Sequence, residues 1–143
     1  MDNLILMILL LGRNKQYLFN PDLGRTLELT LNNTKVDIKG TTGYDYKLDK
    51  MFFANSTTNP ENECFENGEQ LPDGVFDATP VRFGAPVFMS QPHFYQADPY
   101  FASLLAEGSM KPDQKLHETS IVYEPISGKD VFIKYQIFIW NIQ

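Results

Sequence analysis

The residues best suited to catalysis are the two histidines. His93 and His117 are the only histidines in the chain, and Ser90 and Asp98 flank His93. A serine nucleophile needs a base within hydrogen-bonding reach and a third group that orients this base, so His93 with Ser90 or Asp98 would suit a hydrolase. However, no glycine-x-serine-x-glycine turn surrounds any serine, and a histidine without a supporting motif is more often structural. We therefore expect no enzyme and two loop-anchoring histidines held by hydrogen bonds, with the hydrolase as the alternative.

The sequence lacks the patterns of metal and phosphate sites. The two histidines lie far apart, and the carboxylates are scattered without the spacing of zinc or calcium ligands. The loop Gly40–Gly43 has neither the lysine nor the following helix of a phosphate-binding loop. We expect no metal and no cofactor.

The only cysteine is Cys64. A disulfide scaffold needs an even number of cysteines, and a zinc site needs a cluster of ligands. Cys64 is therefore either a buried thiol that packs as a small apolar residue or a disulfide partner whose mate lies outside this chain. Composition alone favours the buried thiol.

Two asparagines head the glycosylation pattern asparagine-x-serine/threonine. They are Asn32, before Asn33-Thr34, and Asn55, before Ser56-Thr57. Both fall in predicted turns, where an acceptor asparagine should lie. Because the pattern is short and also arises by chance, the assignment depends on the compartment of the chain.

Length and charge narrow the class of protein. The chain has 143 residues, enough for one domain, and a net charge of −6. This acidic balance argues against a nucleic-acid partner, which needs a basic surface, and against a polybasic membrane arm. The 13% of aromatic residues favours a β-rich protein.

Apolar and polar residues alternate with a period of two in several segments, which predicts antiparallel strands joined by turns. The predicted strands cover residues 26–31, 36–39, 44–48, 85–89, 120–123 and 131–142. The break between the first two is expected at Asn32–Thr34, and the last two should form a hairpin that turns at Ser127-Gly128. The final strand has apolar residues on both faces, as in a closed or double-layered sheet.

Two non-strand segments are also predicted. Pro99–Leu105 should form a short helix that begins after the capping residue Asp98 and ends by Gly108. The polar stretch Asn55–Asp73 has no periodicity and should be a long surface loop. The apolar run Leu4–Leu11 is too short to span a membrane, which needs about 20 residues, and we expect a buried element or the result of where the chain was cut rather than a signal peptide.

The segment from Phe83 to Pro99 carries a distinctive series of motifs. It contains Gly84-Ala85-Pro86, then Ser90-Gln91-Pro92-His93-Phe94, then Ala97-Asp98-Pro99. Farther along stand His117-Glu118-Thr119 and Glu124-Pro125-Ile126-Ser127-Gly128, and upstream Asn62-Glu63-Cys64-Phe65. This order of motifs resembles the class B scavenger receptor family from Tyr17 onward.

The resemblance implies a fold, a location and a function. It implies a mainly β chain, part of an irregular antiparallel β-barrel ectodomain with short helices, over residues 17–143, preceded by an apolar segment 1–16 without a counterpart in the family. It further implies a membrane receptor, plasma or lysosomal, with this region on the extracellular or lumenal side. Its ligands would be lipids or lipoproteins, and its ectodomain would conduct hydrophobic molecules through a tunnel. The alternative is a truncated product without independent receptor function.

The resemblance also gives a meaning to individual residues. Gly24 and Val81 stand where family members carry the two cysteines of a disulfide, so both partners are missing together. Cys64 matches a family cysteine whose partner would lie upstream of this chain, which favours a disulfide partner outside the chain. The lumenal location favours glycosylation of Asn32 and Asn55. One face of the last strand is a candidate tunnel lining, with plain barrel packing as the alternative; its residues are Phe132, Phe138 and Trp140.

Overall fold

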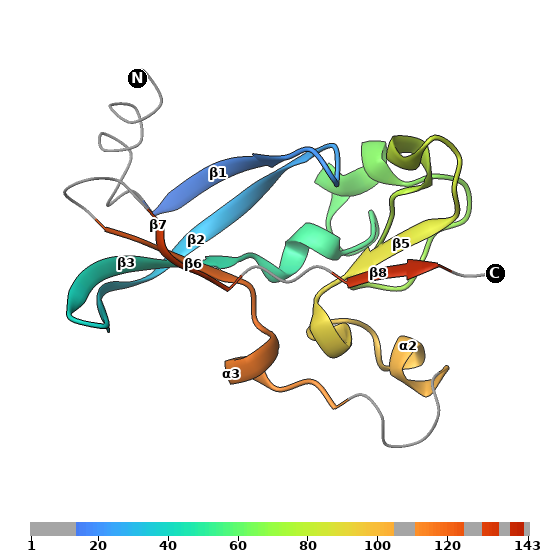
Figure 1. Ribbon diagram of the computed structural model, residues 1–143. Helices are drawn as coiled ribbons and strands as arrows, with labels where there is room; N and C mark the ends of the chain where they lie inside the picture. The colour runs from blue at the N-terminus through green and yellow to red at the C-terminus, as the bar shows by residue number, and fades with distance from the viewer. Residues whose placement is uncertain (1–13, 105–110, 125–129, 135–137, 142–143) are drawn as a thin grey trace. The chain divides into compact units, whose positions relative to one another are not determined.

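The computed structural model describes residues 14–104, 111–124, 130–134 and 138–141, and for the last two ranges only the backbone is discussed (Figure 1). The strands are β1 (Lys15–Asn20), β2 (Arg25–Ile38), β3 (Thr41–Leu48), β4 (Val75–Asp77), β5 (Val87–Ser90), β6 (Ser120–Tyr123), β7 (Asp130–Lys134) and β8 (Phe138–Asn141). The short 3₁₀ helices are η1 (Lys50–Phe53), η2 (Pro60–Phe65), η3 (Thr79–Arg82) and η4 (Pro92–Phe94), and the α-helices are α2 (Pro99–Ser103) and α3 (Gln114–His117). The expected mainly β fold with short helices is confirmed.

The chain divides into two compact units, which are described separately. The first contains the sheet β1-β2-β3-β6-β7, and the second contains the sheet β4-β5-β8 with the helices of the described residues. The turn Asn20–Arg25, between β1 and the body of β2, belongs to the second unit.

The first unit is an antiparallel sheet whose core comes from alternating residues. Leu27 and Leu29 of β2 are fully buried, while Thr26 between the turn and Leu27 is exposed. β3 pairs with β2 and places Leu48 opposite Leu29 and Tyr46 opposite Leu31. The predicted two-residue period therefore corresponds to a half-buried strand, as expected.

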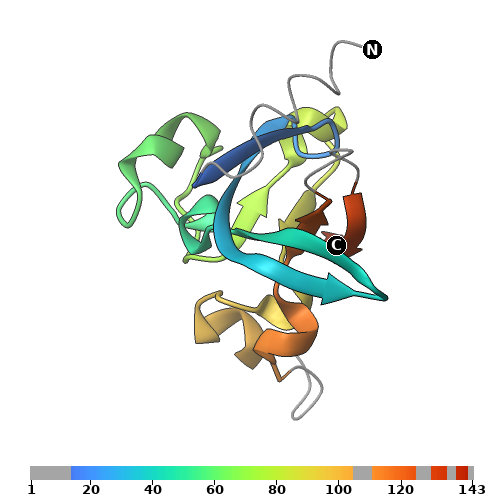
Figure 2. The same ribbon diagram turned by 90° about the vertical axis from the view of Figure 1, so that its left-hand side faces the viewer.

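The predicted break at Asn32–Thr34 is wrong. β2 continues from Arg25 to Ile38, and its pairing with β3 shifts register twice, between Leu31 and Asn33 and between Asn33 and Val36. Extra residues in one strand of an antiparallel pair bend and twist that strand without ending it. Figure 2 shows the resulting strong bend of β2, which curls the sheet in the manner of a partial barrel.

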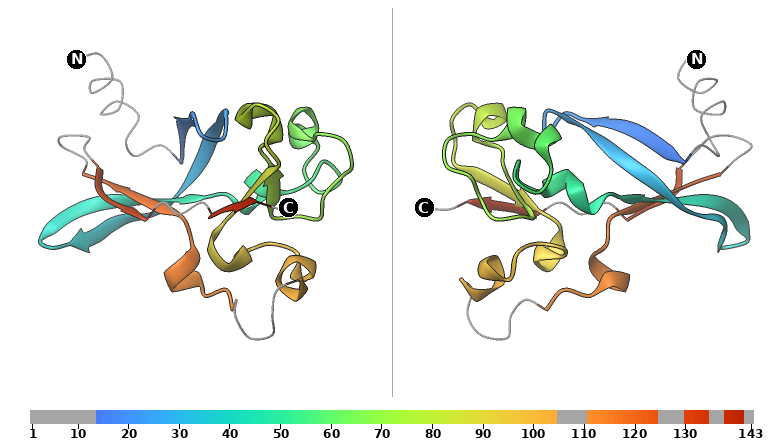
Figure 3. Two further views of the ribbon diagram at one scale, coloured as in Figure 1. Left: turned by 45° about the vertical axis from the view of Figure 1, so that its right-hand side comes forward. Right: turned by 180° about the vertical axis from the view of Figure 1, so that it is seen from behind.

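The hairpin formed by β2 and β3 is longer than the rest of the sheet. β6 pairs only with Tyr44–Lys47 of β3, so the hairpin tip around Ile38–Thr41 extends past its neighbour (Figure 3). Tyr46 and Tyr123 meet edge to face where β3 and β6 pair, with ring centroids 6.0 Å apart.

The second unit has a small antiparallel sheet and its own core. β5 lies between β4 and β8, pairing antiparallel with both. Apolar side chains from the turn, the helices and the sheet fill the core: Leu23, Phe52, Phe53, Ala54, Val75, Phe76, Ala78, Met89 and Phe94.

The single last strand predicted at residues 131–142 is also wrong. The structure has two strands there, and they join different sheets: β7 pairs with β6, whereas β8 pairs with β5. An apolar run with a period of two predicts extended backbone but carries no signal for a change of pairing partner. The predicted turn at Ser127-Gly128 lies outside the described residues, although the antiparallel pairing of its two arms is confirmed.

The predicted short helix is confirmed as α2, which begins at Pro99 after the cap Asp98. The Asp98 carboxylate accepts a hydrogen bond from the backbone N–H of Tyr100 at 2.8 Å. Gly108, the expected end of the helix, lies outside the described residues. Within the described ranges, no helix has both the length and the apolar composition needed to cross a membrane.

Candidate functional site

A buried arginine lies at the centre of the second unit. Arg25 is only 7% exposed, although its guanidinium carries a permanent charge. Its Nη1 donates to the carbonyl of Phe52 at 3.2 Å, and its Nη2 donates to Oδ1 of Asn62 at 2.8 Å. Both partners are neutral, and no carboxylate of the described residues pairs with Arg25.

Aromatic rings compensate part of the missing counter-charge. The guanidinium carbon lies 3.8 Å from the ring centroid of Phe65, 4.2 Å from that of Phe52 and 5.2 Å from that of Phe76. A guanidinium attracts the negative face of an aromatic ring, and the attraction grows when water is excluded. Burial still lowers the pKa of Arg25 to about 10, with nearby Cys64 opposing the shift. The site is therefore a cation held by dipoles and rings rather than by an ion pair.

Asn62 connects this arginine to the surrounding loops. Its Nδ2 lies 2.7 Å from the carbonyl oxygen of Ala54 and 2.9 Å from that of Met51, while its Oδ1 accepts from Arg25. The residue is 6% exposed within η2, in the middle of the predicted surface loop. The prediction of a surface loop at Asn55–Asp73 thus missed a buried asparagine that connects several segments. Asn59-Pro60, a capping residue followed by proline, was the signal for a helical turn here.

A small cavity adjoins the Arg25 cluster. Its lining includes Arg25, Phe52, Phe65 and Asp77, and its volume of about 30 Å³ admits one or two water molecules. A pocket for a drug-sized ligand measures roughly 300 Å³ or more. This cavity is therefore too small for a lipid chain, and the cluster is better suited to holding the fold than to binding such a ligand.

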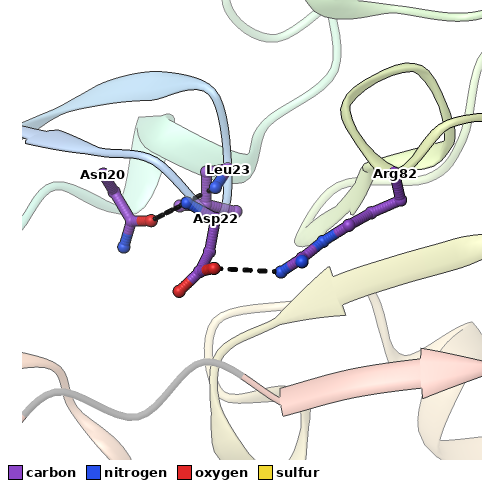
Figure 4. A network of polar contacts seen from close by, with 4 residues as sticks. All are labelled: Asn20, Asp22, Leu23 and Arg82. Carbon is purple, nitrogen blue, oxygen red and sulfur yellow. Dashed lines mark hydrogen bonds and ion pairs between the residues drawn. The ribbon is translucent and has the colours of Figure 1, made fainter.

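The turn before Arg25 is fixed by polar contacts (Figure 4). Oδ1 of Asn20 accepts hydrogen bonds from the backbone N–H groups of Asp22 at 2.7 Å and Leu23 at 3.2 Å. The carboxylate of Asp22 forms an ion pair with Nη2 of Arg82 at 3.2 Å. The residue types of Asn20-Pro21-Asp22 are typical of a turn, and the ion pair ties this turn to η3.

Gly24 and Val81 lie next to each other in this turn region. A Cβ atom placed on Gly24 would lie 3.5 Å from the Cβ of Val81 and 2.6 Å from its Cγ1. Disulfide-linked residues have Cβ atoms roughly 3.5–4.5 Å apart. Gly24 has a φ of +61°, a conformation that glycine adopts without strain. The two positions thus have the spacing of a disulfide, although neither residue is cysteine.

The histidines meet, although the sequence does not predict it. The rings of His93 and His117 stack with centroids 3.9 Å apart. Nδ1 of His117 accepts from the backbone N–H of Asp113 at 2.8 Å, as expected of a loop anchor. Nδ1 of His93 is buried without a hydrogen-bond partner among the described residues, so stacking has the anchoring role that we expected of hydrogen bonds.

The alternative catalytic residues do not form an open site. The side chain of Ser90 is fully buried, and its hydroxyl donates to the carbonyl of Gln91 at 2.9 Å. The carboxylate of Asp98 caps α2. In the described part of the chain, no three histidine, cysteine or carboxylate side chains come together in a way that could hold a metal ion.

Comparison with known proteins decides the family. The sequence matches the CD36 family over residues 9–141, a match that begins ahead of Tyr17. This chain belongs to the CD36 family. It is 34% identical over 110 residues to scavenger receptor class B member 1 of Rattus norvegicus, covering 77% of this chain and 21% of the relative.

Two other members of the CD36 family are similarly related. Lysosome membrane protein 2 of Homo sapiens is 36% identical over 112 residues, covering 78% of this chain and 23% of the relative. Sensory neuron membrane protein 2 of Heliothis virescens is 31% identical over 121 residues, covering 80% of this chain and 23% of the relative. The chain thus spans about a fifth of the length of these CD36 family relatives.

The resemblance to the CD36 family bears on the contact between Gly24 and Val81. The sequence resemblance placed a family disulfide at these two positions, and the structure brings them to disulfide spacing. Cys64, by contrast, is an exposed free cysteine whose Sγ lies 4.0 Å from the carbonyl oxygen of Glu61. The buried thiol that composition favoured is therefore wrong.

The two glycosylation candidates of this CD36 family chain differ in their surroundings. Asn32 is exposed at the first register shift of β2, a strand rather than the predicted turn, and its Nδ2 donates to Asp45 at 2.8 Å. Asn55 is half-buried, and its Nδ2 donates to the carbonyl of Leu71 at 3.0 Å while its Oδ1 accepts from Thr58.

Asn62→Ala should destabilise the second unit. It leaves the buried Nη2 of Arg25 without its acceptor and removes the donor to Ala54 and Met51. We expect a loss of about 3 kcal/mol in the free energy of unfolding, measured by urea denaturation with far-ultraviolet circular dichroism. The control Asn67→Ala removes an exposed amide that contacts Asp77, and should change stability by less than about 0.5 kcal/mol. Equal effects of the two variants would contradict the role of Asn62.

A disulfide should form between Gly24→Cys and Val81→Cys when both are introduced together with Cys64→Ser. The spacing of the two Cβ atoms favours the bond, although the left-handed backbone at position 24 costs about 1 kcal/mol in any residue but glycine. Intact mass spectrometry should show the loss of two thiol hydrogens under mild oxidation. The control pair, Gly24→Cys with Phe83→Cys, places one thiol at a fully exposed position. It should oxidise within the chain much more slowly.

Proposed function

We propose that this chain forms part of the extracellular or lumenal portion of a membrane receptor that binds lipid or lipoprotein ligands. The observation that carries the proposal is the family match over residues 9–141. The names of its relatives support it, since they include a scavenger receptor and two membrane proteins. The described structure is consistent with such a part, because it is a strand-rich scaffold with a strongly curled sheet.

The ligand route in this proposal is a tunnel through the ectodomain. Moving a hydrophobic molecule requires an apolar lining shielded from water and no covalent step. The cavity beside Arg25 is too small for this role, so the route would have to run elsewhere. The face of the predicted last strand remains a candidate lining, with Phe132, Phe138 and Trp140, whose side chains lie outside the described part of the structure.

The positions of Ser90 and His93 favour a receptor over a hydrolase. A nucleophile must reach its substrate, whereas the hydroxyl of Ser90 is buried and already donates to a backbone carbonyl. The ring of His93 stacks on His117. These contacts support structural roles for both residues.

A chimera tests the proposal. Residues 17–143 would replace the matching segment of rat scavenger receptor class B member 1, and cells would be assayed for binding of a lipoprotein that carries a fluorescent lipid. We expect saturable binding above that of untransfected cells. Surface biotinylation measures separately how much chimera reaches the cell surface. The same chimera with Asn67→Ala, a substitution expected to be close to neutral, should bind lipoprotein equally well. A chimera that reaches the surface in full amount but binds no lipoprotein would contradict the proposal.

We also propose that Asn32 carries a glycan when the chain enters the secretory pathway. Its side chain is exposed, which suits an acceptor. Asn55 is the weaker candidate, because its side chain is half-buried and both its Nδ2 and its Oδ1 form hydrogen bonds within the loop. We expect Asn32→Gln to abolish most of the electrophoretic shift that endoglycosidase causes, and Asn33→Gln, at the variable position, to leave it intact. An unchanged shift in Asn32→Gln would sink this assignment.

Cys64 in this proposal is a disulfide partner whose mate lies outside the chain. Its exposure supports this role, because a mate must reach the sulfur. In isolation, the chain should form a slow, reductant-sensitive dimer through Cys64 under prolonged oxidation, and Cys64→Ser should abolish it. Non-reducing electrophoresis is the measurement. Persistent monomer with a thiol that alkylates readily would refute the prediction.

A further inference from the structure

The dipeptide Asn67-Gly68 is prone to a spontaneous reaction. It lies between η2 and β4, in neither a helix nor a strand, and both residues are exposed in the described structure. When glycine follows asparagine, the backbone nitrogen of the glycine can attack the side-chain carbonyl carbon of the asparagine, because no Cβ atom crowds its approach. Two other dipeptides in this part of the sequence also favour such an attack, Asn55-Ser56 and Asp73-Gly74.

Hydrogen bonds hold Asn55-Ser56 away from this reaction. The attacking nitrogen would be that of Ser56, whose N–H donates to Oε1 of Glu66 at 2.6 Å. The side-chain amide of Asn55 is engaged at both ends, since Nδ2 donates to the carbonyl of Leu71 and Oδ1 accepts from the N–H of Thr58. Bringing the nitrogen to the carbonyl carbon would break these hydrogen bonds, which costs free energy.

The dipeptide Asp73-Gly74 is held in the same way. The N–H of Gly74 donates to the carbonyl of Phe53 at 2.8 Å. The carboxylate of Asp73 accepts from the N–H of Asn55 and from the hydroxyl of Thr58, both at 2.8 Å. The backbone is also closely packed here, because a Cβ atom placed on Gly74 would lie 2.2 Å from the Cα of the neighbouring Ala97.

The contacts of Asn67-Gly68 are weaker. Nδ2 of Asn67 donates to Oδ2 of Asp77 at 3.3 Å, at an exposed position. Within the ranges that the structure describes, the N–H of Gly68 donates to no acceptor. A Cβ atom placed on Gly68 would meet no atom within 4 Å, so the backbone can turn at this glycine without a clash. Neither the attacking nitrogen nor the carbon under attack is held by its neighbours.

We propose that Asn67 is the site at which this chain deamidates. The nitrogen of Gly68 forms a bond to Cγ of Asn67 while the bond from Cγ to Nδ2 breaks, and the Gly68 amide proton leaves with Nδ2 as ammonia. Water then adds to either carbonyl of the resulting cyclic imide and opens the ring. The product has aspartate or isoaspartate at position 67. Water is the one co-reactant, so the step needs no oxidant and no cofactor.

The product changes the wall of the cavity beside Arg25. Asn67 and Asp77 both line this cavity, and deamidation replaces the amide that donates to Asp77 with a second carboxylate. Like charges at this distance repel each other, so the contact between position 67 and β4 is lost. Isoaspartate also lengthens the backbone by one carbon atom next to Glu66, whose carboxylate binds the N–H and the hydroxyl of Ser56. Deamidation should therefore loosen this loop locally.

Peptide mapping tests the site. The full chain would be incubated in mildly alkaline buffer, both folded and in concentrated urea, and digested at intervals. Mass spectrometry detects deamidation as a gain of about 1 Da, and an isoaspartyl methyltransferase labels isoaspartate. In the folded chain, we expect position 67 to react at close to its rate in urea. Positions 55 and 73 should react at least about tenfold more slowly than in urea, because they depend on local opening.

Two variants separate the effect of structure from that of sequence. Asp73→Asn creates the same asparagine-glycine dipeptide where the glycine N–H is bonded, and should deamidate in the folded chain at least about tenfold more slowly than position 67. Asn67→Gln should remove most of the isoaspartate, because the longer side chain forms a cyclic imide much more slowly.

Three outcomes would overturn the proposal. The first is protection of position 67 in the folded chain as strong as that of position 55. The second is equal rates at positions 67 and 73 in Asp73→Asn, which an unfolded chain would also give. The third is isoaspartate in Asn67→Gln at the level of the unmodified chain.

Discussion

The burial of the Arg25 charge without a counter-ion constrains the whole second unit. Removing a guanidinium from water is costly, and no carboxylate among the described residues offsets that cost. The compensation comes instead from a backbone carbonyl, the Asn62 amide and three phenylalanine rings. These groups belong to η1, η2 and β4, so each element must be in place before the charge is tolerable. This requirement explains how a region with few regular elements can have one defined arrangement.

The two sheets differ in the interactions that stabilise them. The sheet of the first unit relies on ordinary alternation, with Leu27, Leu29 and Tyr46 fully buried along neighbouring strands. Among its described residues the second unit has three short strands, and its loops supply as much of the core as its sheet does. Polar side chains that satisfy buried backbone groups are therefore more important in the second unit.

The sequence predicted local features well and long-range ones poorly. The strand at Leu27 and Leu29 and the cap at Asp98 depend on neighbouring residues, and both were recovered. The continuation of β2 through Asn32 and Asn33 was missed because an asparagine pair that signals a turn also suits a bulge. Asn62 was missed because its partners are carbonyl oxygens and a distant arginine, which leave no periodic trace.

The family motifs predicted a contact between residues far apart in sequence, which periodicity did not. They placed Gly24 and Val81 together across 57 residues of sequence, and the structure has them in contact. They did not reveal the stacking of His93 on His117, because each histidine lies in a separate motif. The change of partner between β7 and β8 was equally invisible, since both strands share one apolar pattern.

The turn at Asn20–Gly24 has a consequence for how this region opens. Where a covalent bond would close it permanently, this chain closes it with an exposed Asp22–Arg82 ion pair and two hydrogen bonds to Asn20. Ion pairs at the surface weaken as dissolved ions screen them, whereas covalent bonds do not. The frequency with which the turn opens therefore depends on ionic strength, and the amide hydrogens of Asp22 and Leu23 exchange with solvent faster as salt is added. The closure of this turn therefore responds to the ions in the surrounding medium.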